Sequence, residues 1–320
     1  MNRRWLVLLA VGLVCACRAA PIPAGQRYPA GTPLVPRMVS VNGHNLRVVD
    51  TGRGSAVVLV HGLAASLYSW RYTVPALAQD GYRVVAFDNL GFGYSDKPAH
   101  GYSNGDYVGL LIGLMDSLGI SDAVLVGHSM GGAIAAEVAL AHPERVTGLV
   151  LVDAAGFGIR WPFMLKMARW PLVGAIAGLM RGRGSTARLL RRSYADPSRV
   201  TEQDVDQYYA PMTEPGAGRA LRGVLREYGF DTLRGRFDSV AVPTLVMWGS
   251  EDRLIAPAVG QAVVSELQRG AFVLVPGAGH ALPEEAPEAF NRTLLAFLRH
   301  GLPAPPQNVA SSDSGGFGMP

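Results

Sequence analysis

One serine in the sequence has the surroundings of an enzyme nucleophile. Residues 127–131 read GHSMG, which is the pattern G-x-S-x-G with Ser129 at its centre. The apolar run 123–126 precedes it and a helix-like run at 133–141 follows it, which is the strand–turn–helix context that the pattern requires. Small neighbours relieve crowding at a sharp turn and expose the hydroxyl, and the helix N-terminus favours developing negative charge. The pattern therefore predicts that Ser129 attacks a carbonyl group.

Two later loops carry the groups that such a serine needs. An apolar run at 244–248 is followed by the loop GSEDR, which contains Asp252. The last apolar run, 272–275, is followed by PGAGH, which ends in His280. A serine attacks poorly at its ordinary pKa, so we expect His280 to take the proton of Ser129 and Asp252 to orient the imidazole. The chain order nucleophile, acid, base agrees with this interpretation.

A second motif predicts the groups that stabilise an oxyanion. Residues 57–63 read VVLVHGL, a strand that ends in His-Gly at the same edge of the sheet as the serine. Two N–H donors are wanted for a tetrahedral oxyanion. We assign them to Met130 and Leu63, with Ala64 as the alternative to Leu63. His61 is expected to support this loop by hydrogen bonding and not to act as the base.

The elements that position these residues alternate along the chain. Short apolar runs alternate with helix-like stretches, which predicts βαβ units and a mostly parallel sheet. The first two runs flank Asn42-Gly43, a strong hairpin signal. Residues 156–239 lack a convincing strand and are expected to be a helical cap over the carboxyl ends of the strands, where ligands of such sheets bind. The apolar stretch 161–180 either lines a hydrophobic pocket or forms the core of the cap alone. The apolar runs are 38–41, 46–50, 56–60, 83–87, 123–126, 146–152, 244–248 and 272–275.

At these motifs the sequence resembles the α/β-hydrolase superfamily, over about residues 39–299. Residues 88–98 read DNLGFGYSDKP, which is similar to the loop after the family's fourth strand, where Asp88 and Ser95 are expected to be structural. The resemblance implies an α/β fold with a mostly parallel central sheet, flanking helices and a helical cap after the sixth strand. A cap at this place in the chain resembles the cap of esterases, C–C bond hydrolases, epoxide hydrolases and haloalkane dehalogenases. The last two groups use an aspartate at the nucleophile position, where this chain has Ser129.

Other titratable residues compete for these roles. Asp153 ends the strand at 146–152, where some relatives place the acid, and is the alternative to Asp252. Glu251 adjoins Asp252 but fits the pattern less well. His128 lies inside the nucleophile motif and is expected to be a packing or pocket-wall residue.

The first residues resemble an export signal. Arg3 and Arg4 precede the apolar stretch 6–14, as in a secretory signal. The following VCAC resembles a bacterial lipobox, in which Cys17 becomes the lipidated first residue of the mature protein. More than one acyl chain gives stable membrane attachment, so we expect an exported lipoprotein of the bacterial cell envelope. The alternatives are a periplasmic or secreted protein with an ordinary cleaved signal, or an uncleaved anchor.

Composition limits the classes of partner. The chain has 320 residues, 49% of them hydrophobic, and a net charge of +4. Nine basic residues and one acid fall within 160–199. This stripe is either a solvated helical face or a surface for an anionic partner, and no nucleic-acid module accompanies it. Both cysteines lie before residue 18, so the body offers no thiolate ligand, and no metal or nucleotide motif is present. We expect no cofactor, no metal and no nucleic acid.

These observations predict a capped serine hydrolase that cleaves a carboxylic ester of an apolar acyl substrate through an acyl-enzyme. The same three residues also suit lactone, amide or C–C bond hydrolysis, or perhydrolysis. An alternative of another class is a non-catalytic binding or envelope-interaction lipoprotein with this fold. The expected organisation is a signal peptide at 1–17, a linker at 18–36, a core at 37–155 and 240–300, a cap at 156–239 and a flexible tail at 301–320.

Overall fold

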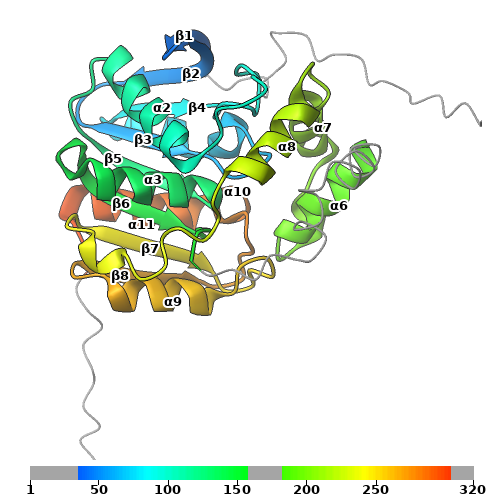
Figure 1. The fold of residues 1–320 in the computed structure, drawn as a ribbon. Coiled ribbons are helices and arrows are strands. Elements are labelled where there is room, and N and C mark those ends of the chain that lie inside the picture. The colour runs from blue at the N-terminus through cyan, green and yellow to red at the C-terminus, as the bar shows by residue number, and fades with distance from the viewer. Residues whose placement is uncertain (1–34, 158–181, 304–320) are drawn as a thin grey trace, which may run out of the picture.

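Eight strands form a single sheet at the centre of the protein (Figure 1). The computed structural model describes residues 35–157 and 182–303. The strand order is β1-β2-β4-β3-β5-β6-β7-β8, with β2 antiparallel to both of its neighbours and every later pair parallel. This confirms the predicted mostly parallel sheet. The strands are β1 Arg37–Val41, β2 His44–Gly52, β3 Ala56–Val60, β4 Arg83–Phe87, β5 Ala123–His128, β6 Val146–Val152, β7 Thr244–Gly249 and β8 Gly270–Val275.

The central strands form because their residues suit a sheet that is covered on both faces. In β3, Val57 to Val60 are fully buried, as expected for a continuous apolar run in a parallel sheet. The predicted hairpin joins β1 and β2, and its two turn residues have positive φ angles of 50° at Asn42 and 81° at Gly43. These angles suit the two-residue turn that Asn-Gly favours.

Helices cover both faces of the sheet. One hydrophobic cluster packs α2 (Asn104–Ser117), α3 (Met130–Ala141) and α9 (Pro257–Glu266) against one face. A second cluster packs α1 (Thr73–Gln79) and α11 (Pro287–His300) against the other. The sheet is therefore the middle of three layers, and its carboxyl edge is left for loops and for the residues between β6 and β7.

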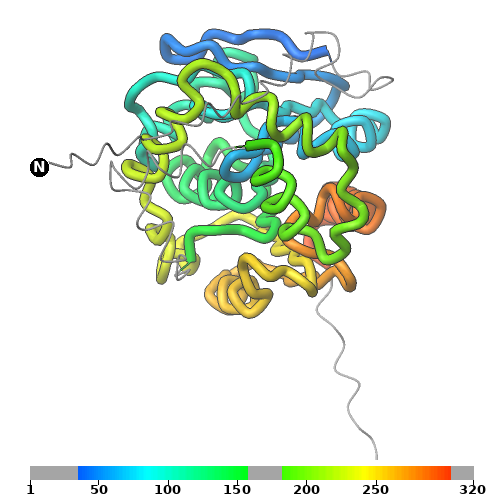
Figure 2. The backbone as a smooth tube through the Cα atoms, turned by 90° about the vertical axis from the view of Figure 1, so that its right-hand side faces the viewer, coloured from blue at the N-terminus to red at the C-terminus, as the bar shows by residue number. Residues whose placement is uncertain are grey.

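The described part of the segment between β6 and β7 contains helices and connecting loops but no strand. It contains α6 (Arg183–Ser193), α7 (Glu202–Met212) and α8 (Ala217–Glu227), together with the 3-10 turns η4 (Pro197–Arg199) and η5 (Phe237–Ser239). Figure 2 looks onto these helices, which lie in front of the sheet. They bond to loops that follow the carboxyl ends of strands: Asp204 accepts a hydrogen bond from Tyr68, which follows β3, and Ser193 accepts one from Ala281, which follows β8. The helices therefore cap that edge of the sheet.

Three short elements complete the description: η2 (Leu67–Trp70), η3 (Pro143–Arg145) and α10 (Leu282–Glu285). The loop after β4 is structural, as expected, because Asp88 accepts the backbone N–H of Leu67 at 2.7 Å and that of Tyr94 at 2.8 Å. Ser95 donates to the carbonyl of Asp88 at 2.6 Å. Within 35–157 and 182–303, no helix has both the length and the apolar character to cross a bilayer.

The basic stripe is partly neutralised where it is described. Arg183 pairs with Glu202 at 2.7 Å and with Asp206 at 2.6 Å, and Arg191 pairs with Glu202 at 2.8 Å. These acids belong to α7, so the contacts join two helices of the cap. This arrangement agrees with a solvated helical face whose charges form ion pairs. Residues 160–181 of the stripe lie outside the described ranges.

Candidate active site

Ser129 lies on a strained turn between β5 and α3. Its backbone angles are φ 52° and ψ −120°, which a non-glycine residue rarely adopts. The backbone N–H of Ser129 donates to the carbonyl of Val152 at 3.0 Å, which ties the turn to the end of β6. A Cβ on Gly131 would lie 2.1 Å from the carbonyl oxygen of Val60, so only glycine fits beside the end of β3.

Helix α3 begins at Met130, three residues before the predicted start at 133. The helix-like run identified in the sequence began after Gly131 and Gly132, which lie in the first turn of the observed helix. Both glycines are required by close packing: a Cβ on Gly132 would lie 2.5 Å from the side chain of Ala154. The predicted start at 133 was therefore too late. The helix begins earlier because the two glycines let its first turn pack closely against the ends of β3 and β6.

The three residues expected to do the chemistry lie together. His280 Nε2 is 3.1 Å from Ser129 Oγ, and His280 Nδ1 is 2.8 Å from Asp252 Oδ2. A carboxylate oxygen only accepts, so Nδ1 carries the hydrogen and Nε2 presents its lone pair to the serine hydroxyl. The other oxygen of Asp252 accepts the N–H groups of Leu254 and Ile255 at 2.7 and 2.9 Å, which fixes the carboxylate. The arrangement can remove a proton from Ser129.

Two backbone donors lie beside the serine. The N–H groups of Leu63 and Met130 donate to no other group among the residues that the structure describes. A Cβ on Gly62 would lie 3.0 Å from the Cβ of Ser129, so the loop after β3 packs directly against the nucleophile turn. Ala64, the alternative donor, has a positive φ of 57°. The N–H groups of Leu63 and Met130 are therefore free of other partners in the described part of the chain, as the predicted role requires.

His61 supports this loop, as expected. It is fully buried, its Nδ1 is 2.8 Å from the carbonyl oxygen of Gly62, and its Nε2 accepts the N–H of Asn89 at 2.8 Å. Burial lowers the pKa of His61, so the ring stays neutral. The loop after β3 is thereby held to the loop after β4.

His128 has a more specific contact than the packing role predicted for it. Its Nε2 is 2.7 Å from the carbonyl oxygen of His280 and must donate, because a carbonyl oxygen only accepts. Burial lowers the pKa of His128 to about 3, with the neighbouring His280 adding to the effect. The ring is therefore neutral and holds the backbone of His280. Its place inside the nucleophile motif is the one sequence signal that indicated a role near the site.

Asp153 and Glu251 do not bond to His280. Asp153 is fully buried and accepts the N–H of Gly249 at 2.8 Å. Burial raises the pKa of Asp153 well above its usual value, and the nearby Asp252 adds to this, so the neutral form of Asp153 is favoured. Glu251 is exposed, and its one ion pair with a described residue is to Arg253, at 3.8 Å. Asp252 is the carboxylate that reaches the imidazole.

A narrow cavity of about 30 Å³ lies between the loop after β3, the loop after β4 and the cap. Ala64, Phe92 and Met212 are among the mostly apolar residues that line it. A larger hollow, of about 620 Å³, is at the opposite edge of the sheet beside residues such as Ser55 and Asp122, so it is remote from Ser129. The apolar stretch 161–180, for which the sequence left a pocket-lining role and a cap-core role open, and Cys17 lie outside the described ranges. Within those ranges no three His, Cys, Asp or Glu residues are grouped to hold a metal ion.

Comparison with known proteins agrees with this geometry. The profile of the family described as "alpha/beta hydrolase fold" matches residues 55–287. The chain is 30% identical to a 2-hydroxymuconate semialdehyde hydrolase of Pseudomonas putida, over 84% of this chain and 96% of the relative.

Solved structures give the same result. A meta-cleavage product hydrolase from Pseudomonas fluorescens IP01 superposes with a TM-score of 0.73 at 28% identity, covering 83% of this chain and 98% of the other. A thermophilic esterase from Thermogutta terrifontis superposes with a TM-score of 0.70 at 25% identity, covering 83% and 98%. The family match spans most of the chain and the strand order and nucleophile turn accord with it. The chain belongs to the α/β-hydrolase fold family and is a hydrolase.

Proposed function

We propose that this protein is a serine hydrolase that cleaves a carboxylic ester of an apolar acyl substrate through an acyl-enzyme. One observation carries the proposal: His280 bonds to Ser129 Oγ at 3.1 Å and to Asp252 at 2.8 Å at the same time. A serine, a base and an orienting acid in one chain of hydrogen bonds are the requirement for nucleophilic catalysis by serine.

The proposed reaction has two halves. Ser129 Oγ attacks the ester carbonyl carbon while its proton passes to His280 Nε2, and Asp252 stabilises the imidazolium that forms. The N–H groups of Leu63 and Met130 donate to the oxyanion of the tetrahedral intermediate. The intermediate collapses, the bond to the alkoxy oxygen breaks, and His280 gives its proton to the departing alcohol. A water molecule, deprotonated by His280, then attacks the acyl carbonyl and releases the acid, which restores Ser129.

The apolar acyl group is inferred from the walls of the narrow cavity. Ala65, Phe92, Pro211, Met212 and Leu221 present hydrocarbon beside the loop that carries Leu63. A cavity of about 30 Å³ accommodates a water-sized group, so a long acyl chain requires the helices above it to move. Burying one methylene is worth about 0.8 kcal/mol, so an apolar site grades esters by chain length.

The test is labelling with a fluorescent fluorophosphonate, combined with turnover of p-nitrophenyl esters of two to sixteen carbons. The wild-type protein should be labelled and active, and Ser129→Ala should lose both properties while it stays folded. A folded wild-type protein with neither property would favour a non-catalytic binding protein. Equal rates across all chain lengths would contradict the apolar acyl site.

C–C bond hydrolysis is a second candidate, because the named relatives include a 2-hydroxymuconate semialdehyde hydrolase and a meta-cleavage product hydrolase. Loss of the absorbance of 2-hydroxymuconate semialdehyde measures this activity directly. A kcat/KM for that compound far above the values for the p-nitrophenyl esters would assign the protein to C–C cleavage. The same comparison, made with lactones, amides and peracid formation, separates the remaining carbonyl chemistries.

We also propose that the protein is exported and attached to the bacterial envelope through a lipid on Cys17. The support is the basic and apolar leader followed by VCAC, in a chain whose later residues contain no cysteine. Replacing Cys17 by serine should release the protein from the membrane fraction or block its processing. Unchanged processing and membrane association would refute lipidation and leave a periplasmic, secreted or otherwise anchored protein.

A further inference from the structure

Two buried glutamates lie four and five residues after His280 in the chain. Glu284 and Glu285 end the short helix α10, and they are 7% and 3% exposed. Buried carboxylates are uncommon and need partners. Both side chains bond to the segment between β6 and β7. Glu284 binds a residue of α7, whereas Glu285 binds the chain that follows α6.

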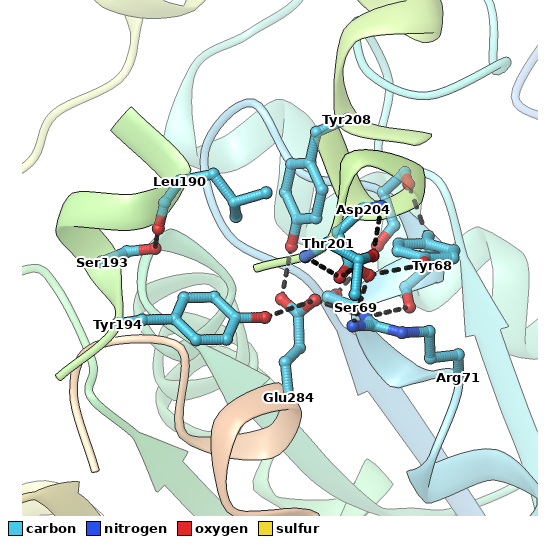
Figure 3. A network of polar contacts seen from close by, with 11 residues as sticks. Tyr68, Ser69, Arg71, Leu190, Ser193, Tyr194, Thr201, Asp204, Tyr208 and Glu284 are labelled. Atoms are coloured by element: carbon cyan, nitrogen blue, oxygen red, sulfur yellow. Dashed lines mark hydrogen bonds and ion pairs between the residues drawn. The ribbon is translucent and has the colours of Figure 1, made fainter. Parts of the chain in front are cut away.

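Glu284 belongs to a network that joins α7 to the rest of the protein (Figure 3). It accepts hydrogen bonds from Tyr208 and pairs with Arg71, and the hydroxyl of Tyr194 lies 3.5 Å away. Arg71 also pairs with Asp204 at 2.9 Å. The side chains of Glu284, Tyr208, Arg71 and Asp204 do not bond to residues 278–281, which we call the His280 loop. Glu284 reaches that loop only through its backbone N–H, which donates to the carbonyl of Ala281 at 2.9 Å at the start of α10. The side-chain network therefore fastens the cap without bonding to the His280 loop.

Glu285 bonds to the His280 loop itself. Its Oε2 accepts the N–H of Gly279 at 2.7 Å and that of Ala195 at 2.9 Å, and its Oε1 accepts the N–H of Asp196 at 2.8 Å. Gly279 precedes His280, whereas Ala195 and Asp196 belong to the chain that leaves α6. The carboxylate of Glu285 therefore links the His280 loop to the cap by three charge-assisted hydrogen bonds.

The two segments also touch directly. On the other side of His280, the N–H of Ala281 donates to the carbonyl of Ser193 at 3.1 Å. A Cβ on Gly279 would lie 2.6 Å from both the nitrogen of Ala195 and the carbonyl oxygen of Ser193, so the backbones are in contact. Both neighbours of His280 are thus held by the end of α6, one directly and one through Glu285.

We propose that Glu285 is a positioning residue, which couples the end of α6 to His280 and thereby sets the distance between the imidazole and Ser129. The proposal rests on the proposed function, since it assigns the use of the same base. Its consequence is that a displaced α6 leaves His280 poorly placed to accept the serine proton. A misplacement of about 1 Å in such a site costs on the order of 10²-fold in rate.

The experiment compares Glu285→Gln with its neighbour Glu284→Gln in the full-length protein. Both variants change one buried carboxylate of α10, but only the side chain of Glu285 bonds to a neighbour of His280. Fluorophosphonate labelling rate, kcat and KM for one p-nitrophenyl ester, the pH profile of kcat and Tm are measured for each. Glu285→Gln should lower kcat and the labelling rate by about 10²-fold with little change in KM. Glu284→Gln should lower Tm with kcat within about threefold of wild type.

Glu285→Asp is a milder variant. It keeps the carboxylate, but the shorter side chain cannot reach both Gly279 and the end of α6 equally well. Its kcat and labelling rate should lie between those of wild type and Glu285→Gln. If Glu285→Gln does not fold, Glu285→Asp provides the test. Wild-type labelling and kcat in folded Glu285 variants would overturn the proposal, as would equal losses of kcat in the two glutamine variants at equal losses of Tm. Absence of labelling in the wild-type protein would instead refute the proposed function, so the two failures are distinguishable.

Discussion

Two aspartates follow neighbouring strands, and their hydrogen bonds give them different chemistry. Asp252 follows β7 and lies 2.8 Å from His280 Nδ1, with its second oxygen held by two backbone N–H groups. Asp153 follows β6, accepts one N–H from Gly249, and has an oxygen without a partner among the described residues. Burial and the nearby Asp252 raise the pKa of Asp153 well above its usual value, which favours the neutral acid.

Replacing each aspartate by asparagine separates their roles. Asp252→Asn should lower kcat on the order of 10³- to 10⁴-fold, because an amide cannot stabilise the imidazolium or hold its tautomer. Asp153→Asn should change kcat by less than about tenfold, because the neutral acid is replaced by a group of the same shape. Steady-state turnover of one ester by both variants checks this. Comparable losses in both would show that the two carboxylates act together.

At the scale of elements, two helices contain glycines with opposite surroundings. Gly109 in α2 is exposed, and a Cβ there would meet nothing within 4 Å. Gly131 in α3 has the carbonyl of Val60 where its Cβ would lie. Gly109→Ala should therefore raise the free energy of unfolding by about 0.5–1 kcal/mol, and Gly131→Ala should lower it by about 1–3 kcal/mol.

Urea unfolding of the two alanine variants measures these changes, and each variant is the control for the other. Gly131→Ala should also slow fluorophosphonate labelling, because the nucleophile turn must move away from β3. Gly109→Ala should not change labelling. A destabilised Gly109→Ala would mean that α2 is not an ordinary solvent-facing helix at that position.

The elements themselves were largely predictable from the sequence, because continuous apolar runs identify strands that are buried on both faces. The predicted ranges of β3, β4 and β6 match the observed strands to the residue. β8 begins at Gly270, two residues before the predicted run, because its pairing with β7 extends to Thr244. The serine, acid and base were predicted because each follows a recognisable strand.

The links between the cap and the core had no sequence signal. Glu285 lies in the acidic stretch PEEAPE, which is typical of a solvated turn, yet it bonds to Ala195, 90 residues away in the chain. Arg71 and Asp204 are 133 residues apart and give no local hint of their pairing. Such contacts follow from how the cap docks, and single-sequence patterns report only local periodicity.

For the whole molecule, a buried histidine and a buried aspartate change the free energy of unfolding with pH in opposite directions. His128 has a pKa lowered to about 3, against about 6.5 in the unfolded chain. As pH falls below about 6.5, the unfolded state takes up a proton that the folded state refuses, so this histidine lowers stability. Asp153 has a raised pKa, so the folded state takes up its proton first and this aspartate raises stability on acidification.

These signs predict opposite pH trends for two variants in urea unfolding between pH 8 and pH 5. The destabilisation by His128→Asn should shrink as pH falls, by about 1.4 kcal/mol per pH unit below about 6.5, because asparagine removes the unfavourable titration. The destabilisation by Asp153→Asn should grow over the range in which the folded aspartate alone is protonated. Each difference is taken against wild type at the same pH, so titrations common to both proteins cancel. Parallel trends in the two variants would mean that one of these buried groups is charged in the folded protein.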